Sequence, residues 1–182
     1  MAYMVKEIIS WLKAIIIALL IVFGVRHFIM EPSIVKGDSM LPNLHEGDRI
    51  IISKISSIDR FDEIAFVSPD TDDNYVKRVI GLPGDRIVIE NDTLYINDEP
   101  YEESYLDDFK SQLAEGQIFT QDFDLEADYG YQVVPDGTYF VLGDNRPISR
   151  DSRSFGVINE DSIIGEVVFR IWPIQVIGPI KH

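Results

Sequence analysis

The feature that most constrains this chain is a long apolar stretch near its N-terminus. Residues 8–30 read IISWLKAIIIALLIVFGVRHFIM, with an unbroken apolar run from Ala14 to Val25 and only Lys13 interrupting the part before it. About 18 residues of this stretch can cross the hydrocarbon core of a bilayer, if the Lys13 amine extends toward the headgroups. We therefore expect a transmembrane helix, with Trp11 at the membrane interface.

Two other interpretations of this stretch have to be weighed. A cleaved secretory signal has an apolar run of about 7 to 15 residues, and the 12 residues from Ala14 to Val25 fall in that range. The residues that follow, RHFIME at 26–31, lack small residues at the spacing that a processing enzyme accepts. A buried globular helix that is apolar on every face would need a larger protein around it. We therefore expect residues 1–30 to be a retained anchor.

The basic residues around the apolar stretch do not fix its orientation. Lys6 and Lys13 precede or enter the stretch, whereas Arg26 and Lys36 follow it. The positive-inside rule compares such counts across the membrane, and here they are nearly balanced. Sidedness is therefore left open by the residues alone.

Residues 31–182 are predicted to form a single β-rich domain. Their apolar residues come in short runs rich in β-branched and aromatic side chains, and not at helical spacing. Turn signals separate the runs, and Pro83-Gly84 suits the two central positions of a type II turn. We expect a meander of antiparallel hairpins, with strands in the following ranges: 49–53, 63–67, 75–80, 86–90, 93–96, 138–142 and 164–172.

An acidic insertion at about 98–132 separates two strand-rich halves. Between Asp98 and Asp128 the sequence has eleven acidic residues against the single Lys110, and its apolar periodicity is weak. Such stretches are more often solvated loops than specific recognition sites. We expect a solvated insertion of that kind.

Composition excludes several classes of function. The formal net charge of −15 argues against binding to nucleic acid. The chain has no cysteine, so it has no thiolate zinc site and no thiol nucleophile. The three histidines, at positions 27, 45 and 182, do not have the spacing of a helical metal site. We expect no metal and no other cofactor.

Three segments, at 37–42, 75–81 and 143–153, concentrate reactive and turn-forming residues. Taken singly, each has an ordinary explanation. Ser39 could be a turn serine, Lys77 could point to solvent from a strand, and the third segment could be a loop held by Asp and Arg pairs. Their order along the chain is more informative than any one of them.

Together these segments resemble the conserved boxes of the type I signal peptidase family. SMLP follows the apolar span, YVKRVIGLPGD lies in a predicted strand, and GDNR leads into SRDSRSFG, so that the resemblance runs from about residue 5 to residue 174. The resemblance implies a coiled antiparallel β-sheet or barrel. It also implies that Ser39 is the nucleophile, that Lys77 is the general base, and that Ser149 hydrogen-bonds and orients the lysine amine.

The implied roles are chemically coherent. A serine hydroxyl needs a base to remove its proton, and a neutral lysine can do so. An ordinary lysine, with a pKa of about 10.4, is almost fully protonated at neutral pH, so the pKa of Lys77 must be lowered by burial. A fall of about 2 units requires roughly 2.7 kcal/mol, which desolvation can supply. Val76, Val79 and Met40 are the expected apolar neighbours.

The resemblance also implies a binding site for an extended peptide and a scaffold of ion pairs. The peptide would pair with strands near 33–35 and 74–76, with small side chains in shallow subsites. The residues expected to bind substrate are Val35, Met40, Tyr75 and Val76. The residues expected to form scaffold salt bridges, without a role in proton transfer, are Arg78, Asp144, Arg146, Asp151 and Arg153.

The chain departs from the better-studied branch of the family at two places. Gly37 stands two residues before the nucleophile, where many relatives have a serine whose hydroxyl helps form the oxyanion hole. The hole would then rely on the Ser39 backbone N–H and a neighbouring donor. Pro147-Ile148 in the third box keeps the matched residues in register but changes the expected shape of the loop.

The function implied is removal of signal peptides from exported preproteins at the outer face of the bacterial cytoplasmic membrane, with the N-terminus inside. The expected partners are signal peptides and the lipid bilayer, and the oligomeric state is not predicted. A self-cleaving repressor with a Ser-Lys dyad is disfavoured by the span and the acidity. The alternative of another class is a catalytically silent, membrane-tethered peptide-binding envelope protein of the same fold.

Overall fold

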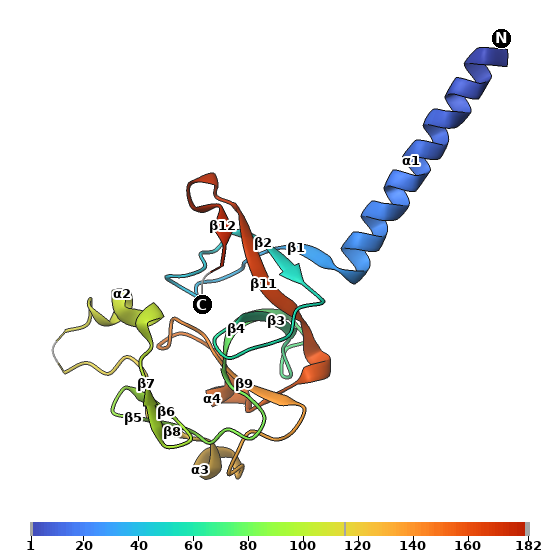
Figure 1. Ribbon diagram of the computed structural model, residues 1–182. Coiled ribbons are helices and arrows are strands. Elements are labelled where there is room, and N and C mark those ends of the chain that lie inside the picture. Colours follow the sequence, from blue (N-terminus) through green and yellow to red (C-terminus); the bar gives the residue numbers. More distant parts are fainter. Residues whose placement is uncertain (1, 115, 181–182) are drawn as a thin grey trace.

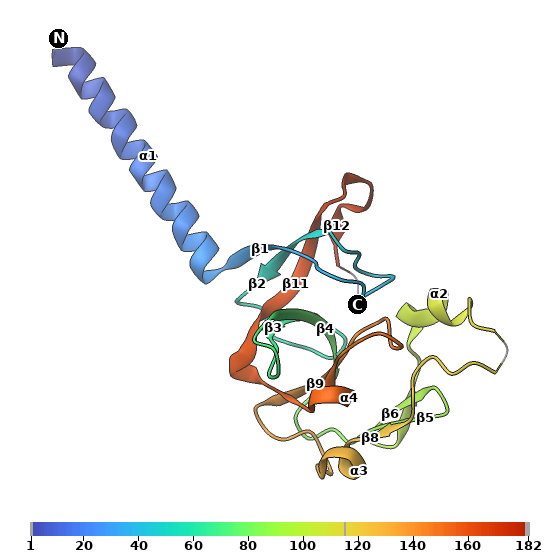
Figure 2. The same cartoon turned by 180° about the vertical axis from the view of Figure 1, so that it is seen from behind.

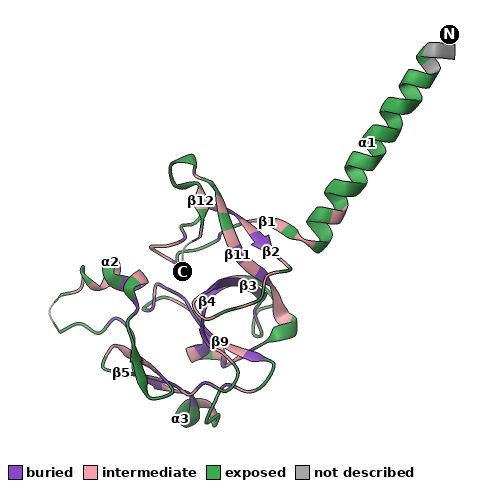
Figure 3. Ribbon diagram, in the orientation of Figure 1, coloured by how far each residue is buried: buried purple, intermediate pink, exposed green. Residues whose placement is uncertain are grey.

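One long helix and a β-rich body make up the chain. The structure, a computed structural model, describes residues 2–114 and 116–180. Helix α1 (Ala2–Phe28) projects away from the body as a single rod (Figures 1 and 2). Within it Lys6–Phe28, 23 residues with none buried, is long and apolar enough to cross a membrane, and Figure 3 shows its exposed surface along almost its whole length. The predicted apolar helix is confirmed.

The body is built on an eight-stranded antiparallel sheet that curls around the core. Its order is β1-β2-β11-β3-β4-β9-β10, with β12 paired to β11. The strands are β1 (Met30–Ile34), β2 (Arg49–Ser53), β3 (Glu63–Val67), β4 (Asn74–Gly81), β9 (Thr138–Leu142), β10 (Ile158–Asn159), β11 (Ile163–Trp172) and β12 (Gly178–Pro179).

A smaller antiparallel sheet, of order β7-β6-β5-β8, lies at one end of the body (Figure 1). Its strands are β5 (Ile87–Glu90), β6 (Thr93–Ile96), β7 (Glu99–Tyr101) and β8 (Phe123–Asp124). The short helical segments are η1 (Ser104–Leu106), α2 (Asp107–Lys110), α3 (Leu125–Tyr129), α4 (Ser152–Phe155), η2 (Glu160–Ser162) and η3 (Ile174–Val176).

The mainly β fold class is confirmed, with an antiparallel sheet and one N-terminal apolar helix, and each of the seven predicted ranges overlaps a strand. In the turn after β4, Gly84 has φ +89° and the Asp85 N–H donates to the Leu82 carbonyl at 3.0 Å. Both observations fit the expected turn at Pro83-Gly84. The apolar pattern by itself does not predict strand β1, because its sequence MEPSI contains a proline and no apolar run. Only the family resemblance implied a strand near residues 33–35.

The acidic insertion is not solvated throughout, contrary to the expectation from its composition. It contributes β7, β8 and α3 to the smaller sheet and its surroundings. Phe123 and Leu125 pack into the same core cluster as Phe140 of β9. Leu106 and Phe119 are also buried. The insertion is therefore joined to the main body by apolar packing.

Candidate active site

Ser39 lies in a turn that follows β1. Gly37 has φ +73°, a left-handed conformation that glycine adopts without strain. The side chain of Met40, next to Ser39, is only 1% exposed, and the Leu44 N–H donates to the Met40 carbonyl at 2.9 Å. Ser39 itself is half-buried. The buried methionine thus fixes the turn that carries the hydroxyl.

Lys77 reaches this turn from the middle of β4. It pairs with Ile64 of β3 in the main sheet, and its side chain is 3% exposed. Its Nζ donates to Ser39 Oγ at 2.7 Å and to the Val76 carbonyl at 3.1 Å. A neutral amine can accept the hydroxyl proton over the same short distance. The structure therefore brings together the two side chains predicted to react.

Burial makes the Lys77 amine a better candidate base. Desolvation lowers its pKa to about 8, although the negative charges of Asp151 and Asp144 oppose that fall. No carboxylate forms an ion pair with the amine among residues 2–114 and 116–180. An appreciable fraction of the amine is therefore neutral near pH 8.

Arg78, the next residue in β4, has the opposite environment. Its guanidinium is fully buried and pairs with Asp144 at 2.7 Å and with Glu63 at 2.8 Å. Desolvation by itself lowers the pKa of Arg78, but hydrogen bonding and attraction to Asp144 more than offset it, so the pKa lies above its ordinary value. Burial raises the pKa of Glu63 to about 7. The Arg78 guanidinium therefore keeps its charge and is not suited to proton transfer.

The third segment, residues 143–153, lies against the Ser39 turn. The Asn145 N–H donates to the Ser39 carbonyl at 3.0 Å, and Asn145 Nδ2 donates to the Asp38 carbonyl at 3.1 Å. Gly143 is so close that an added Cβ would meet the Ser39 carbonyl oxygen at 2.6 Å and would also overlap the Ser149 hydroxyl. The segment supports the nucleophile through main-chain contacts.

Ser149 does not make the bond expected of it in this conformation. Its Oγ is buried and has no hydrogen-bond partner among the described residues. The hydroxyl does lie beside Gly143, which is also close to the Ser39 carbonyl. Its lysine-orienting role stays a prediction.

The five residues predicted to form scaffold salt bridges all take part in ion pairs. Arg78 pairs with Asp144, and Arg153 pairs with Asp151 at 2.8 Å. Arg146 pairs with Glu103 of the acidic insertion. That partner was not predicted, because Glu103 is one acidic residue among many and is 43 positions away from Arg146.

A groove of about 680 Å³ runs beside the Ser-Lys pair. The four residues predicted to bind substrate, Val35, Met40, Tyr75 and Val76, all line it together with Ser39 and Lys77. Strand β1 lies at the edge of the main sheet, because among the described strands it pairs only with β2. The first residues of β4 pair only with β3, because β9 joins the strand from Arg78 onward. Two strand edges therefore face a cavity with room for an extended peptide.

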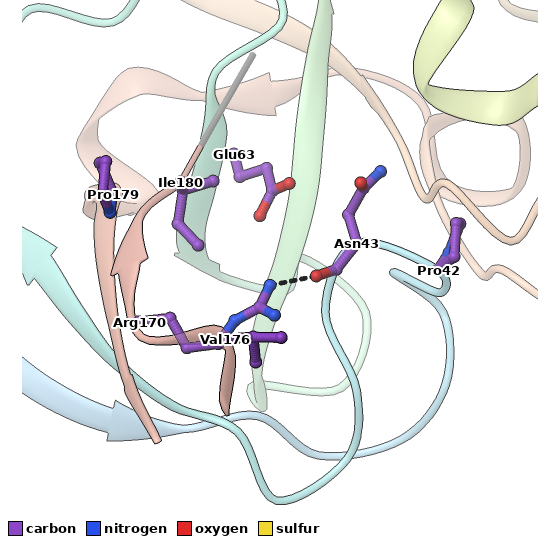
Figure 4. A pocket seen from close by; sticks show the side chains of 7 residues that line it. All are labelled: Pro42, Asn43, Glu63, Arg170, Val176, Pro179 and Ile180. Atoms are coloured by element: carbon purple, nitrogen blue, oxygen red, sulfur yellow. Dashed lines mark hydrogen bonds between the residues drawn. The ribbon is translucent and has the colours of Figure 1, made fainter. Parts of the chain in front are cut away.

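A second pocket, of about 290 Å³, lies between the turn after Ser39 and the β11–β12 hairpin (Figure 4). The Arg170 guanidinium in it donates to the Asn43 carbonyl, and Glu63 also lines it. Asn43 Nδ2 in turn donates to Asp144 at 2.6 Å. This pocket is lined by neither Ser39 nor Lys77.

No group of three or more His, Cys, Asp or Glu side chains in the described ranges could hold a metal ion. The Ser39–Lys77 pair, with its 2.7 Å contact, can offer nucleophilic and acid–base chemistry.

Comparison with known proteins assigns the chain to a family. A family model described as "Signal peptidase, peptidase S26" matches residues 8–172. The chain belongs to the signal peptidase family. The membrane-tethered, catalytically silent alternative has no support among these findings, whereas the predicted resemblance to signal peptidases is confirmed.

Members of the signal peptidase family resemble the chain over most of its length. Signal peptidase IB of Staphylococcus aureus (strain COL) is 42% identical over 178 residues, which cover 93% of this chain and 92% of the relative. Signal peptidase I of Bacillus caldolyticus is 45% identical, over 87% of this chain and 88% of the relative. The crystal structure of a signal peptidase I from Enterococcus faecalis V583 matches with a TM-score of 0.60 and 45% identity, covering 62% of this chain and 98% of that one.

The close contact at Gly143 predicts the effect of a single methyl group. Gly143→Ala should push the third segment away from the Ser39 carbonyl, and a displacement of about 1 Å can lower a reaction rate by about a hundredfold. We expect kcat for peptide cleavage to fall by at least about tenfold.

Gly24→Ala in α1 is the matched control, because nothing lies within 4 Å of the added methyl group. It should leave kcat unchanged. Wild-type kcat in Gly143→Ala would show that the third segment does not fix the position of Ser39.

Proposed function

We propose that this chain is a membrane-bound signal peptidase I that removes N-terminal signal peptides from exported preproteins with Ser39 and Lys77 as its catalytic pair. One observation carries the residue assignment. The amine of Lys77, a residue that is only 3% exposed, lies 2.7 Å from the Ser39 hydroxyl, and both residues line the groove of a signal peptidase fold.

The proposed reaction proceeds through an acyl-enzyme. Neutral Lys77 takes the proton of the Ser39 hydroxyl as its oxygen attacks the scissile carbonyl carbon. The lysine then gives that proton to the leaving amine of the mature protein, and the signal peptide remains bound to Ser39 as an ester. A water molecule, activated by the same amine, hydrolyses the ester and restores both side chains.

Charge on the attacked carbonyl oxygen needs hydrogen-bond donors. The Ser39 backbone N–H has no acceptor among the residues that the structure describes, so we assign it to the oxyanion hole. Gly37 offers no side-chain hydroxyl to assist. Ser149, whose buried hydroxyl has no partner among the described residues, is assigned to accept a hydrogen bond from the lysine amine once the amine has gained its proton.

Substrate recognition would use the two unpaired strand edges of the groove. An extended signal peptide can add main-chain hydrogen bonds to β1 and to the first residues of β4, as in other cases of strand addition. Val35 and Met40 would contact its side chains from one wall, and Tyr75 and Val76 from the other. The shallow subsites between them suit small side chains near the cleaved bond.

The anchor has a role in this proposal. Confining the enzyme and a membrane-inserted substrate to one surface raises their effective concentration, so a shallow site with weak intrinsic affinity is sufficient. We place the N-terminus of α1 inside the cell and the β-rich body at the outer face of the cytoplasmic membrane. Exported preproteins emerge there.

Substitution of either catalytic side chain tests the dyad. Ser39→Ala removes the nucleophile and Lys77→Ala removes the base, so each should lower preprotein cleavage by about a thousandfold or more. The measurement is cleavage of a purified preprotein by the full chain in detergent, followed by gel electrophoresis.

The controls make the same substitutions outside the site. Ser162 lies in η2 and Lys110 lies in the insertion. The variants Ser162→Ala and Lys110→Ala should both cleave the preprotein at the wild-type rate. Full activity in Ser39→Ala or in Lys77→Ala would refute the proposed dyad.

Protease protection tests the proposed orientation. Protease added to intact spheroplasts should digest the β-rich body, because this body is expected outside the cytoplasmic membrane. An immunoblot against the body would report its loss, with a cytoplasmic protein as the control for membrane integrity. Protection of the body until detergent is added would place it inside the cell and contradict the proposal.

A further inference from the structure

The acidic insertion contacts the residues that support the candidate active site. Glu103 and Thr120, two polar residues of the insertion, are 6% and 1% exposed. In Figures 1 and 2 the loop that follows β9 runs beside the segment that carries α2. The contacts between the two segments are made by Arg146, which is 2% exposed.

The insertion surrounds the Arg146 guanidinium with polar groups. Arg146 forms an ion pair with Glu103, and its remaining N–H groups lie 3.4 Å from the Thr120 hydroxyl and 3.3 Å from the Tyr105 hydroxyl. The Tyr105 hydroxyl itself donates to Glu103 at 2.6 Å. Burial by itself lowers the pKa of Arg146, and the Glu103 carboxylate more than offsets this effect. The guanidinium is therefore charged and held in one place.

From Arg146 the contacts continue to the nucleophile. Its Nε donates to the Gly143 carbonyl at 2.9 Å, and its own carbonyl accepts from Arg153 at 2.8 Å. Asn145, which directly precedes Arg146 in the chain, donates its N–H to the Ser39 carbonyl. A shift of Arg146 would therefore move the main chain at Asn145, which is hydrogen-bonded to Ser39.

A second contact leads from the insertion to the residue beside the candidate base. The Arg78 guanidinium lies over the Tyr105 ring, 4.3 Å from its centroid, a distance typical of a favourable cation–π contact. Arg78 follows Lys77 in β4 and pairs with Asp144. Glu103 thus contacts Arg146, whose segment bonds the Ser39 turn, and Tyr105 contacts Arg78, which is next to Lys77.

We infer that Glu103 is a positioning residue for signal-peptide cleavage, because it holds Arg146 and, through Arg146, the segment at 143–149 against the turn that carries Ser39. Glu103 does not line the substrate groove, so it does not contact substrate. The inference rests on the proposed function, in which Ser39 is the nucleophile.

This role predicts a selective kinetic effect. Glu103→Gln keeps the shape of the side chain but leaves the buried guanidinium without its counter-charge. We expect kcat to fall by about tenfold or more while KM changes by less than about twofold, since the groove is unaltered. A residue that serves stability alone would lower the melting temperature but leave kcat per folded molecule at its wild-type value.

The experiment compares full-length variants in detergent. The kinetic constants for a synthetic signal-peptide substrate are normalised to the folded fraction, which is taken from thermal melting followed by circular dichroism. Glu102→Gln is the matched control, because Glu102 is the exposed neighbour in the same insertion and should retain wild-type kcat and KM. Tyr105→Phe removes only a hydroxyl and should give a smaller fall in kcat, so it serves as the readout if Glu103→Gln does not fold.

The outcomes separate the inference from the function on which it rests. Wild-type kcat per folded molecule in Glu103→Gln, or in Tyr105→Phe where that variant is the readout, overturns the positioning role. A rise in KM with unchanged kcat overturns it as well, because it would place Glu103 in substrate binding. Ser39→Ala in the same assay reports on the dyad alone, and its full activity would overturn the proposed function instead.

Discussion

One physical constraint underlies the candidate site: Lys77 is buried, and its amine has no carboxylate partner among the described residues. The Lys77 side chain is 3% exposed, and desolvation disfavours its charged form. Its neighbour Arg78 is buried as completely but is paired with Glu63 and Asp144. Successive side chains of a strand point to opposite faces, so two adjacent basic residues can have opposite environments. The guanidinium of Arg78 is held charged, whereas the pKa of the Lys77 amine is lowered, as the proposed base role requires.

The remaining elements hold the serine hydroxyl against that amine. Ser39 and Lys77 are 38 positions apart, and their contact is fixed by the turn after β1, by β4 and by the segment at 143–153. In the segment at 143–153, the Asn145 N–H donates to the Ser39 carbonyl, and there is no room for a Cβ at residue 143. The geometry of the pair is therefore a property of three distant segments that pack together.

Prediction from the sequence succeeded where the signal is local. Apolar runs with β-branched residues gave strands such as β2 and β3, and the uniformly apolar stretch gave α1. Motif order gave Ser39 and Lys77, whose chemistry requires the proximity that the structure has. The apolar pattern missed β1, an edge strand that is held by its pairing with β2, and only the family resemblance implied a strand near residues 33–35. Prediction failed for Glu103, because the burial of one carboxylate among eleven acidic residues depends on a partner far along the chain.

Direct titration of Lys77 is the measurement that tests this account most closely. In the full chain with 13C-labelled lysine side chains, the Cε signal of Lys77 is identified by its absence in Lys77→Arg and is followed by NMR as the pH rises. The amine is protonated below its pKa and neutral above it, so a lowered pKa brings the neutral base to lower pH. The expected midpoint for Lys77 is near 8, below the ordinary lysine value of about 10.4. A Lys77 midpoint at that ordinary value would contradict this account.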